Sequence, residues 1–220
     1  MTSESRESAS HALHSQLAKH KDRTKNNFHC MERKYIQDKN FDKSDFIKDP
    51  LQQADYENCS FINCDLSNSN LSRVHFIECT FNTCNLSTAK LNKTAFRDSV
   101  FKDCKLMGLQ FATCDDFLFT ATFENCILNF SSFYKMKLKK TVYKNCNLSE
   151  VDFTEADLSA ALFDHCDLAK ALFENTILEK TDFRTAYNYS IDPELNKLKK
   201  ARFSLPGIAG LLDKYDIDIE

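Results

Sequence analysis

Cysteine is the residue of this chain whose type and spacing could do chemistry. Ten Cys occur in 220 residues, and thiols can hold zinc, form disulfides or act as nucleophiles. Eight of them recur at intervals of twenty residues, in three series: Cys59 and Cys79; Cys64, Cys84 and Cys104; and Cys126, Cys146 and Cys166. A zinc site needs thiolates that converge on one point, whereas a fixed interval spreads them along an axis. We therefore interpret them as buried, weakly polar side chains stacked in a ladder.

Histidines and paired carboxylates also fail to form a convincing site. His75 and His165 lie beside large apolar residues and should point outward, and neither has a Ser or Cys nucleophile in a plausible triad. Asp115 and Asp116 are expected to bond local backbone. There is no glycine-rich phosphate loop. The sequence predicts a protein that is not an enzyme and has no catalytic, cofactor or metal site.

Large apolar residues at every fifth position organise the chain. From Phe123 to Phe183 they recur thirteen times without a miss, each with a mostly small residue two places earlier. On a helix, five residues turn about 500°, which scatters them around the axis, and on a strand an odd spacing sends them to opposite faces. A chain that turns a corner every five residues points them all inward. The predicted core stack is Phe61, Phe81, Phe101, Phe123, Leu128, Phe133, Leu138, Leu148, Phe153, Leu158, Phe163, Leu168 and Phe173.

The pattern predicts an all-β solenoid with four corners per coil. In the first part of the chain the large residues read aromatic, aromatic, Leu, Leu, which gives a period of about twenty residues and about seven coils over residues 35–190. The phase breaks at 112–117, where we expect a two-residue bulge or small loop. Beyond it, aromatic and Leu corners alternate, so like residues should lie on opposite sides.

Residues 191–220 read as a cap. Asp192 is a good N-cap and Pro193 fits the first turn of a helix, while Ser204 and Pro206 suit the start of a second, shorter one. An alternating DIDIE strand would close the chain. The cap would cover the open backbone edge of the last coil. Its apolar residues exceed what capping needs and predict a symmetric homodimer formed tail to tail; they are Leu205, Ile208, Leu211, Leu212, Ile217 and Ile219.

Composition excludes several classes of protein. The formal net charge of -3 does not suggest a nucleic-acid binder, and no run is long and apolar enough to cross a membrane. Residues 1–34 are polar, lack a signal-peptide core and are expected to form a flexible arm, with a short helix near His11–Lys21. Free cysteines without a signal predict a cytoplasmic protein. With only three Gly and three Pro, Asn and Asp are expected to build the corners.

Two charged surfaces are candidates for recognition. The outward acidic residues of the later coils can be a solvated face or a surface for a basic partner; they are Asp152, Glu155, Asp157, Asp164 and Asp167. The densest basic patch is Lys135, Lys137, Lys139 and Lys140. We interpret it as a solubility feature or a protein contact, because it has no exposed aromatic residue beyond Tyr134.

Several quintets resemble the pentapeptide repeat family, whose motif is a small residue, Asp or Asn, Leu or Phe, and two mostly polar positions. Examples are CDLSN at Cys64, CNLST at Cys84, CNLSE at Cys146, ADLSA at Ala156 and CDLAK at Cys166. The resemblance covers roughly residues 41–183 and implies a right-handed, quadrilateral β-helix. The ending LLDKYDIDIE is similar to the tail through which quinolone-resistance (Qnr-type) members dimerise.

The resemblance also implies a function. Qnr-type members bind the type II topoisomerases, DNA gyrase and topoisomerase IV, by imitating duplex DNA, and protect them from quinolones. The acidic coils of residues 145–190, with nine Asp/Glu against three Lys/Arg, would be the surface for such a partner. The alternative is a structural or adaptor solenoid with a different protein partner.

Overall fold

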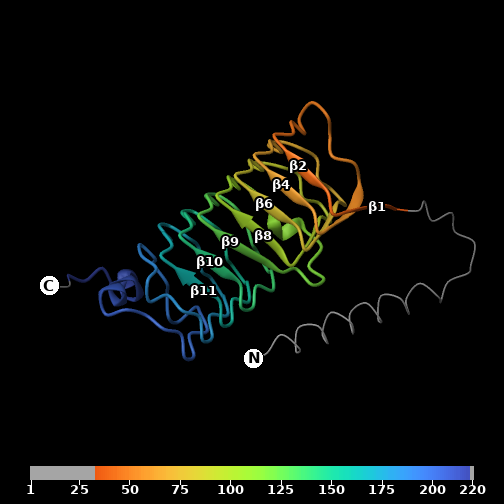
Figure 1. Cartoon of the computed structure of the whole chain (residues 1–220). Coiled ribbons are helices and arrows are strands. Elements are labelled where there is room, and N and C mark those ends of the chain that lie inside the picture. The colour runs from red at the N-terminus through yellow and green to blue at the C-terminus, as the bar shows by residue number, and fades with distance from the viewer. Residues whose placement is uncertain (1–32, 219–220) are drawn as a thin grey trace, which may run out of the picture. The chain divides into compact units, whose positions relative to one another are not determined.

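The computed structural model describes residues 33–218; most of the predicted N-terminal arm, its helix and Ile219 lie outside the described residues. The described chain is a parallel β-solenoid of about seven turns with almost no helix, which confirms the predicted fold (Figure 1). Its strands are β1 (Lys34–Gln37), β2 (Asn40–Asp42), β3 (Ala54–Glu57), β4 (Ser60–Ile62), β5 (His75–Ile77), β6 (Thr80–Asn82), β7 (Ala95–Arg97), β8 (Ser99–Lys102), β9 (Ala121–Glu124), β10 (Val142–Lys144) and β11 (Leu162–Asp164).

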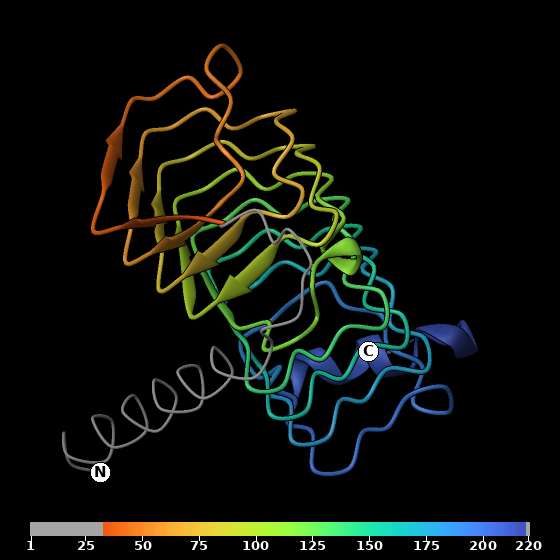
Figure 2. The same cartoon turned by 90° about the vertical axis from the view of Figure 1, so that its right-hand side faces the viewer.

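Each coil is a square turn stacked on the next, as Figure 2 shows. We name the four sides of the solenoid after one coil's corners: the Phe61, Leu66, Leu71 and Phe76 sides. The Phe61 side carries the parallel sheet β11-β10-β9-β8-β6-β4-β2, and the Phe76 side carries β1-β3-β5-β7. The other two sides are joined by isolated parallel bridges. A residue therefore lies directly beside the residue twenty positions away, or twenty-two positions away where the pair spans the phase break.

One ladder of aromatic rings runs through the whole solenoid behind the Phe61 side. The rings of Phe61 and Phe81 are stacked with centroids 4.8 Å apart, and the ladder ends at Phe203, 5.3 Å from the ring before it. All thirteen residues of the predicted core stack are buried, with Phe173 the most exposed at 5%. Rings in register at this separation exclude water along the axis and add stacking to the burial of apolar area.

A second aromatic ladder changes sides in the middle of the solenoid. It comprises Tyr56, Phe76 and Phe96 on the Phe76 side, then Phe111, Phe133, Phe153 and Phe173 on the Leu71 side. Phe119 joins the two parts, because its ring lies edge-on to Phe96 at 6.3 Å and to Phe111 at 6.1 Å. The aromatic residues of a coil therefore lie on two adjacent sides, Phe61 and Phe76, before this point, and on two opposite sides, Phe61 and Leu71, after it. Phe119 is a core residue that the five-residue spacing does not predict.

The two extra residues of the phase break lie between Asp115 and Ala121, a stretch that overlaps the end of the predicted segment and extends beyond it. The N–H of Asp115 still donates to Thr94 O at 2.9 Å, as expected for an interval of twenty residues. Ser99, however, pairs with Ala121, an interval of twenty-two. The insertion therefore falls after Asp115, and it places Phe119 inside the solenoid.

Corners are built by left-handed residues that are almost all non-glycine. Positive φ recurs every five residues and is adopted by Asn, Asp, Lys, Glu and Thr, among others. Asp65 and Asn147 each directly precede the large residue of their corner, and the side-chain oxygen of each accepts a hydrogen bond from the backbone N–H of the residue two positions later. Asp65 accepts from Ser67 at 3.0 Å, and Asn147 accepts from Ser149 at 3.0 Å. These bonds satisfy backbone groups that the sharp turns leave unpaired.

The helix predicted to begin at Asp192 does not form, because the next residues make another coil. Lys197 pairs in parallel with Ile177, and Phe203 continues the Phe61-side ladder. Leu198 and Phe203 in fact keep the five-residue spacing. The open backbone edge of the preceding coil offers hydrogen bonds to this segment, and they outweigh the local helix signals.

Beyond the last coil the tail forms two short 3-10 helices, η2 (Pro206–Leu211) and η3 (Asp213–Tyr215). A third, η1 (Phe111–Thr113), precedes the insertion. The second predicted helix thus forms in 3-10 geometry. No strand forms in residues 216–218, the described part of the predicted DIDIE strand. Among the residues that the structure describes, no helix is long and apolar enough to cross a membrane.

Candidate interaction surface

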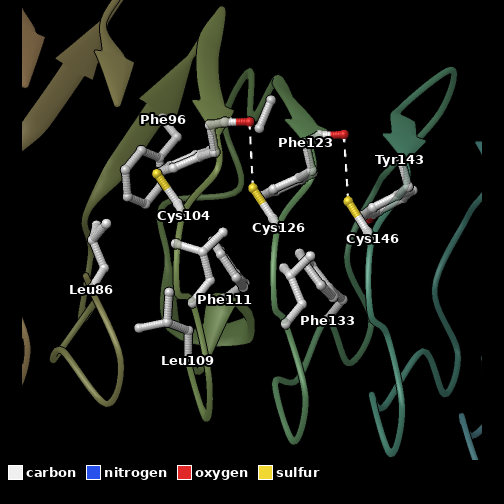
Figure 3. Close-up of a cluster of buried hydrophobic side chains, with 14 of the residues drawn as sticks. Leu86, Phe96, Cys104, Leu109, Phe111, Phe123, Cys126, Phe133, Tyr143 and Cys146 are labelled. Atoms are coloured by element: carbon white, nitrogen blue, oxygen red, sulfur yellow. Dashed lines mark hydrogen bonds between the residues drawn. The ribbon is translucent and has the colours of Figure 1, made fainter. Parts of the chain in front are cut away.

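The cysteine ladder is a structural feature of the core. Figure 3 shows Cys126 and Cys146 each donating to a backbone carbonyl of the coil before, and the Sγ of Cys146 lies 3.5 Å from Phe123 O. Burial raises the pKa of the Cys79 thiol to about 12, so this thiol stays protonated near neutral pH. Within residues 33–218, no group of three or more His, Cys, Asp or Glu could hold a metal ion.

His75 belongs to a charged cluster that the sequence pattern did not reveal. Its Nδ1 lies 3.0 Å from Asp55 Oδ1, and the Nε of Arg33 lies 2.6 Å from the same oxygen. Burial tends to raise the pKa of Asp55, but its hydrogen bond with His75 and the charge of Arg33 outweigh burial and lower it. The cluster links Arg33, which directly precedes β1, to Asp55 in β3 and His75 in β5. Asp55 and His75 are twenty residues apart, which is the signal that could have predicted their contact.

The five predicted acidic residues do not lie on one face. Asp152 and Glu155 are on the Leu71 side, Asp157 on the Phe76 side, Asp164 on the Phe61 side and Asp167 on the Leu66 side. The reason is the four-cornered coil, since a spacing of five residues moves a side chain by one side. The later coils are acidic all round rather than along one stripe.

Three of these carboxylates are corner residues as well as surface charges. Asp152, Asp157 and Asp167 accept the N–H two residues on at 2.9, 3.1 and 3.1 Å. Burial tends to raise the pKa of Asp157, but hydrogen bonds with Ser159 and Lys139 outweigh burial and lower it. Their position therefore has a structural explanation, but an Asn would make the same bond without the charge.

The predicted basic patch is split by a corner and partly neutralised. Lys137, Lys139 and Lys140 lie on the Phe76 side, whereas Lys135 is on the Leu71 side. Lys139 is 3.1 Å from Asp157, the acidic residue of the next coil on its side. Lys135 is paired in the same way, 3.3 Å from a carboxylate of the next coil on the Leu71 side. Pairing between coils leaves less free positive charge than the sequence suggests.

The tail leaves part of its predicted dimer surface exposed. Leu205 is 85% exposed and Ile217 55%, and Ile208 is also exposed. Leu211 instead packs against the core, and Leu212 is half-buried. The packing of Leu211 holds the tail on the last coil. Three of the predicted apolar residues remain available to a partner among those that the structure describes.

Lys214 fixes the tail electrostatically. Its Nζ lies 2.7 Å from Asp192 Oδ1 and 2.7 Å from Glu194 Oε2. The hydrogen bond with Lys214 lowers the pKa of Asp192. Gly207 packs on Tyr189, where a Cβ would collide with the phenol ring. The tail is thus seated on the last coil through its own contacts.

Comparison with known proteins identifies the family. The family described as "Pentapeptide repeat region" matches residues 54–115 and 117–187. The chain belongs to the pentapeptide repeat family. The match ends before the last coil, whose Asn188 and Pro193 interrupt the apolar series.

Solved structures of similar proteins include two pentapeptide repeat proteins. Full-length QnrB1, a plasmid-mediated fluoroquinolone resistance protein, is 18% identical, with 83% of this chain and 100% of that chain covered and a TM-score of 0.45. HetL from the cyanobacterium Nostoc sp. strain PCC 7120, involved in heterocyst differentiation regulation, is 16% identical, with 87% and 94% covered and a TM-score of 0.36. No curated protein matches the chain. The family assignment rests on the repeat match.

Proposed function

We propose that this pentapeptide repeat protein is a non-catalytic, cytoplasmic binding module whose acidic later coils contact a basic surface of a protein partner. The observation that carries the proposal is the presence of carboxylates on all four sides over residues 145–190. Negative charge around a rod resembles the charge around a DNA duplex, where phosphates face every direction. The partner we propose is a type II topoisomerase, DNA gyrase or topoisomerase IV, which the protein would protect from quinolones by partial DNA mimicry.

In corners where an Asp or Asn side-chain oxygen accepts a backbone N–H, the charge can be removed without changing the backbone. Asp152→Asn, Asp157→Asn and Asp167→Asn delete three negative charges and keep an oxygen that can accept the same N–H, as Asn147 does in its own corner. The matched control is Asp65→Asn, which makes the same change at a corner of an early coil. All four positions keep their corner bonds, so differences in binding would report charge.

The test is DNA supercoiling by purified gyrase in the presence of a quinolone, with this protein titrated in. Rescue by near-stoichiometric protein is expected, with a weaker effect for the triple Asn variant and an unchanged effect for Asp65→Asn. Because the lost attraction is electrostatic, the difference should shrink as salt is raised. Neither rescue nor inhibition by the wild-type protein would contradict the topoisomerase proposal.

A structural or adaptor protein is the alternative function. The ion pairs that link coils favour it, because pairs such as Lys139–Asp157 neutralise charges that a DNA mimic would leave free. An adaptor would bind its partner through uncharged or mixed surfaces. In that case a pull-down with the triple Asn variant would recover the same partner as the wild-type protein.

We further propose that the tail forms a homodimer contact through Leu205, Ile208 and Ile217. Leu205→Asp with Ile217→Asp changes two exposed side chains and leaves the packed Leu211 in place. A buried aspartate pair would disfavour tail pairing. Light scattering of the variant should show loss of that contact with the same fold by circular dichroism, and an unchanged mass would place the contact elsewhere.

A further inference from the structure

Charge changes sign along the Leu71 side. Arg73, Lys90 and Lys93 are exposed on its early coils, and none of them has an ion-pair partner within residues 33–218. The later coils carry Asp152, Glu155 and Glu174 on the same side. Between them lie the uncharged residues Gln110, Ala112, Thr113 and Ser132, together with Lys135, whose Nζ lies 3.3 Å from Glu155. One side of the solenoid is therefore basic in its first half and, apart from the paired Lys135, acidic in its second.

We propose that the Leu71 side binds the Leu71 side of a second copy of this chain, with the two solenoids antiparallel. The twofold axis would lie in the plane of the interface, perpendicular to the long axis of the solenoid. It would pass midway between the coils of Phe111 and Phe133. This rotation reverses the order of the coils and keeps each residue's position across the side. The coil of Leu91 then faces that of Phe153.

The register matches charges individually. Lys93 lies two residues after Leu91 and would face Glu155, which lies two residues after the corner Phe of its own coil. Glu155 is also 3.3 Å from Lys135 of its own chain, so Lys93 would be a second cation beside this carboxylate. Lys90 and Asp152 each lie one residue before their corner residue, so they would face one another too. Arg73 would meet the coil that carries Glu174. Since the axis is twofold, each of these contacts occurs twice.

The two central coils of the same register carry one charged residue, Lys135, which is paired with Glu155 of its own chain. Ala112 would face Tyr134, because each follows the corner Phe of its coil. The Tyr134 hydroxyl donates to Glu155 and Lys135 Nζ lies 4.8 Å from the ring centroid, but the side chain is still 38% exposed, and this exposed part would pack on the alanine of the other copy. At about 4.8 Å per coil and five residues per side, the contact would be roughly 500 Å² per copy. This is near the lower limit for specific interfaces and implies a weak, concentration-dependent dimer.

Two charge-reversal variants test this register. The basic-half variant is Arg73→Glu with Lys93→Glu, and the acidic-half variant is Glu155→Lys with Glu174→Lys. Both leave the corner residue Asp152 unchanged. Arg73, Lys93 and Glu155 have positive φ, a conformation that Lys and Glu both adopt elsewhere in the solenoid. The backbone should therefore accept each exchange.

All proteins in this experiment are full-length and carry Leu205→Asp and Ile217→Asp, so that the proposed tail contact cannot contribute to association. Sedimentation velocity at low ionic strength is expected to show self-association of this parent. Each reversal variant alone would bring like charges together in the register, and its self-association should be about ten- to a hundredfold weaker. An equimolar mixture should recover association, because every facing pair is then again of opposite charge.

The mixture gives the decisive comparison. Recovery by mixing requires that the early coils of one copy face the later coils of the other, so it supports the antiparallel contact. A mixture that associates no more than its components, variants that self-associate like the parent, or a monomeric parent would each overturn it. None of these outcomes depends on gyrase, so the result is separate from that of the supercoiling assay.

Discussion

Phe153→Ala should strongly destabilise the solenoid. The Phe153 side chain is fully buried. Its ring stacks between Phe133 at 5.4 Å and Phe173 at 5.3 Å and meets Tyr143 and Phe163 edge-on. Truncating a buried Phe to Ala costs about 3–5 kcal/mol. The truncation would leave a cavity. The coils above and below cannot move in to fill it without breaking their own backbone hydrogen bonds. We therefore expect a loss of unfolding free energy in the upper half of this range.

Phe130→Ala is the matched control. Phe130 is 54% exposed at a corner with φ of 62°, so the same chemical change removes little buried area, and the free energy of unfolding should change by about 0.5 kcal/mol or less. Urea unfolding followed by circular dichroism measures both variants. Neighbouring coils can unfold separately in a solenoid, so hydrogen exchange in β10 and β11 should be measured alongside. A loss below about 1 kcal/mol for Phe153→Ala would refute the inward packing that defines this core.

Three further changes test other parts of the fold. Phe119→Ala should lower the free energy of unfolding by about 3 kcal/mol in urea, because its ring joins the two parts of the second aromatic ladder; a neutral result would show that the insertion closes without it. Asp167→Ala should cost about 1 kcal/mol through loss of its corner bond, whereas Asp167→Asn should be nearly neutral. Folding lowers the pKa of Asp55, so its ionised form contributes stability above about pH 4 that is lost as the pH falls further. Thermal unfolding between neutral and acidic pH should show a smaller decline for Asp55→Asn, and equal declines would contradict this contribution.

The fold was predictable because the same physical constraint acts at every coil. The inward-pointing position of each corner is buried, so it is occupied by Phe or Leu and not by a charged residue. The spacing of residues such as Phe123 and Leu128 in the sequence therefore gives the spacing of the corners. Corner chemistry was partly predictable too, since Asn and Asp supply the local hydrogen bonds. Lys, Glu and even Phe130 adopt positive φ, and only the coil's tertiary pairing explains why they tolerate it.

What failed were judgements made from local signals alone. Asp192 and Pro193 suit a helix start, but the open edge of the coil before them gives the backbone a competing set of hydrogen bonds. Phe119 escaped notice because an insertion removes it from the five-residue count. The five acidic residues were grouped as one outward surface from their nearness in the sequence, whereas each step of five residues moves to another side of the solenoid.

Self-association and partner binding would compete for the later coils. The antiparallel contact covers Asp152 and Glu155, which are also part of the acidic surface proposed for the topoisomerase. Arg73→Glu with Lys93→Glu should break the Leu71-side contact and leave both acidic residues untouched. If the free protein is the form that binds gyrase, this variant should protect supercoiling at lower concentration than the wild-type protein. Weaker protection would instead mean that the partner recognises the dimer, or that the early coils contact it directly.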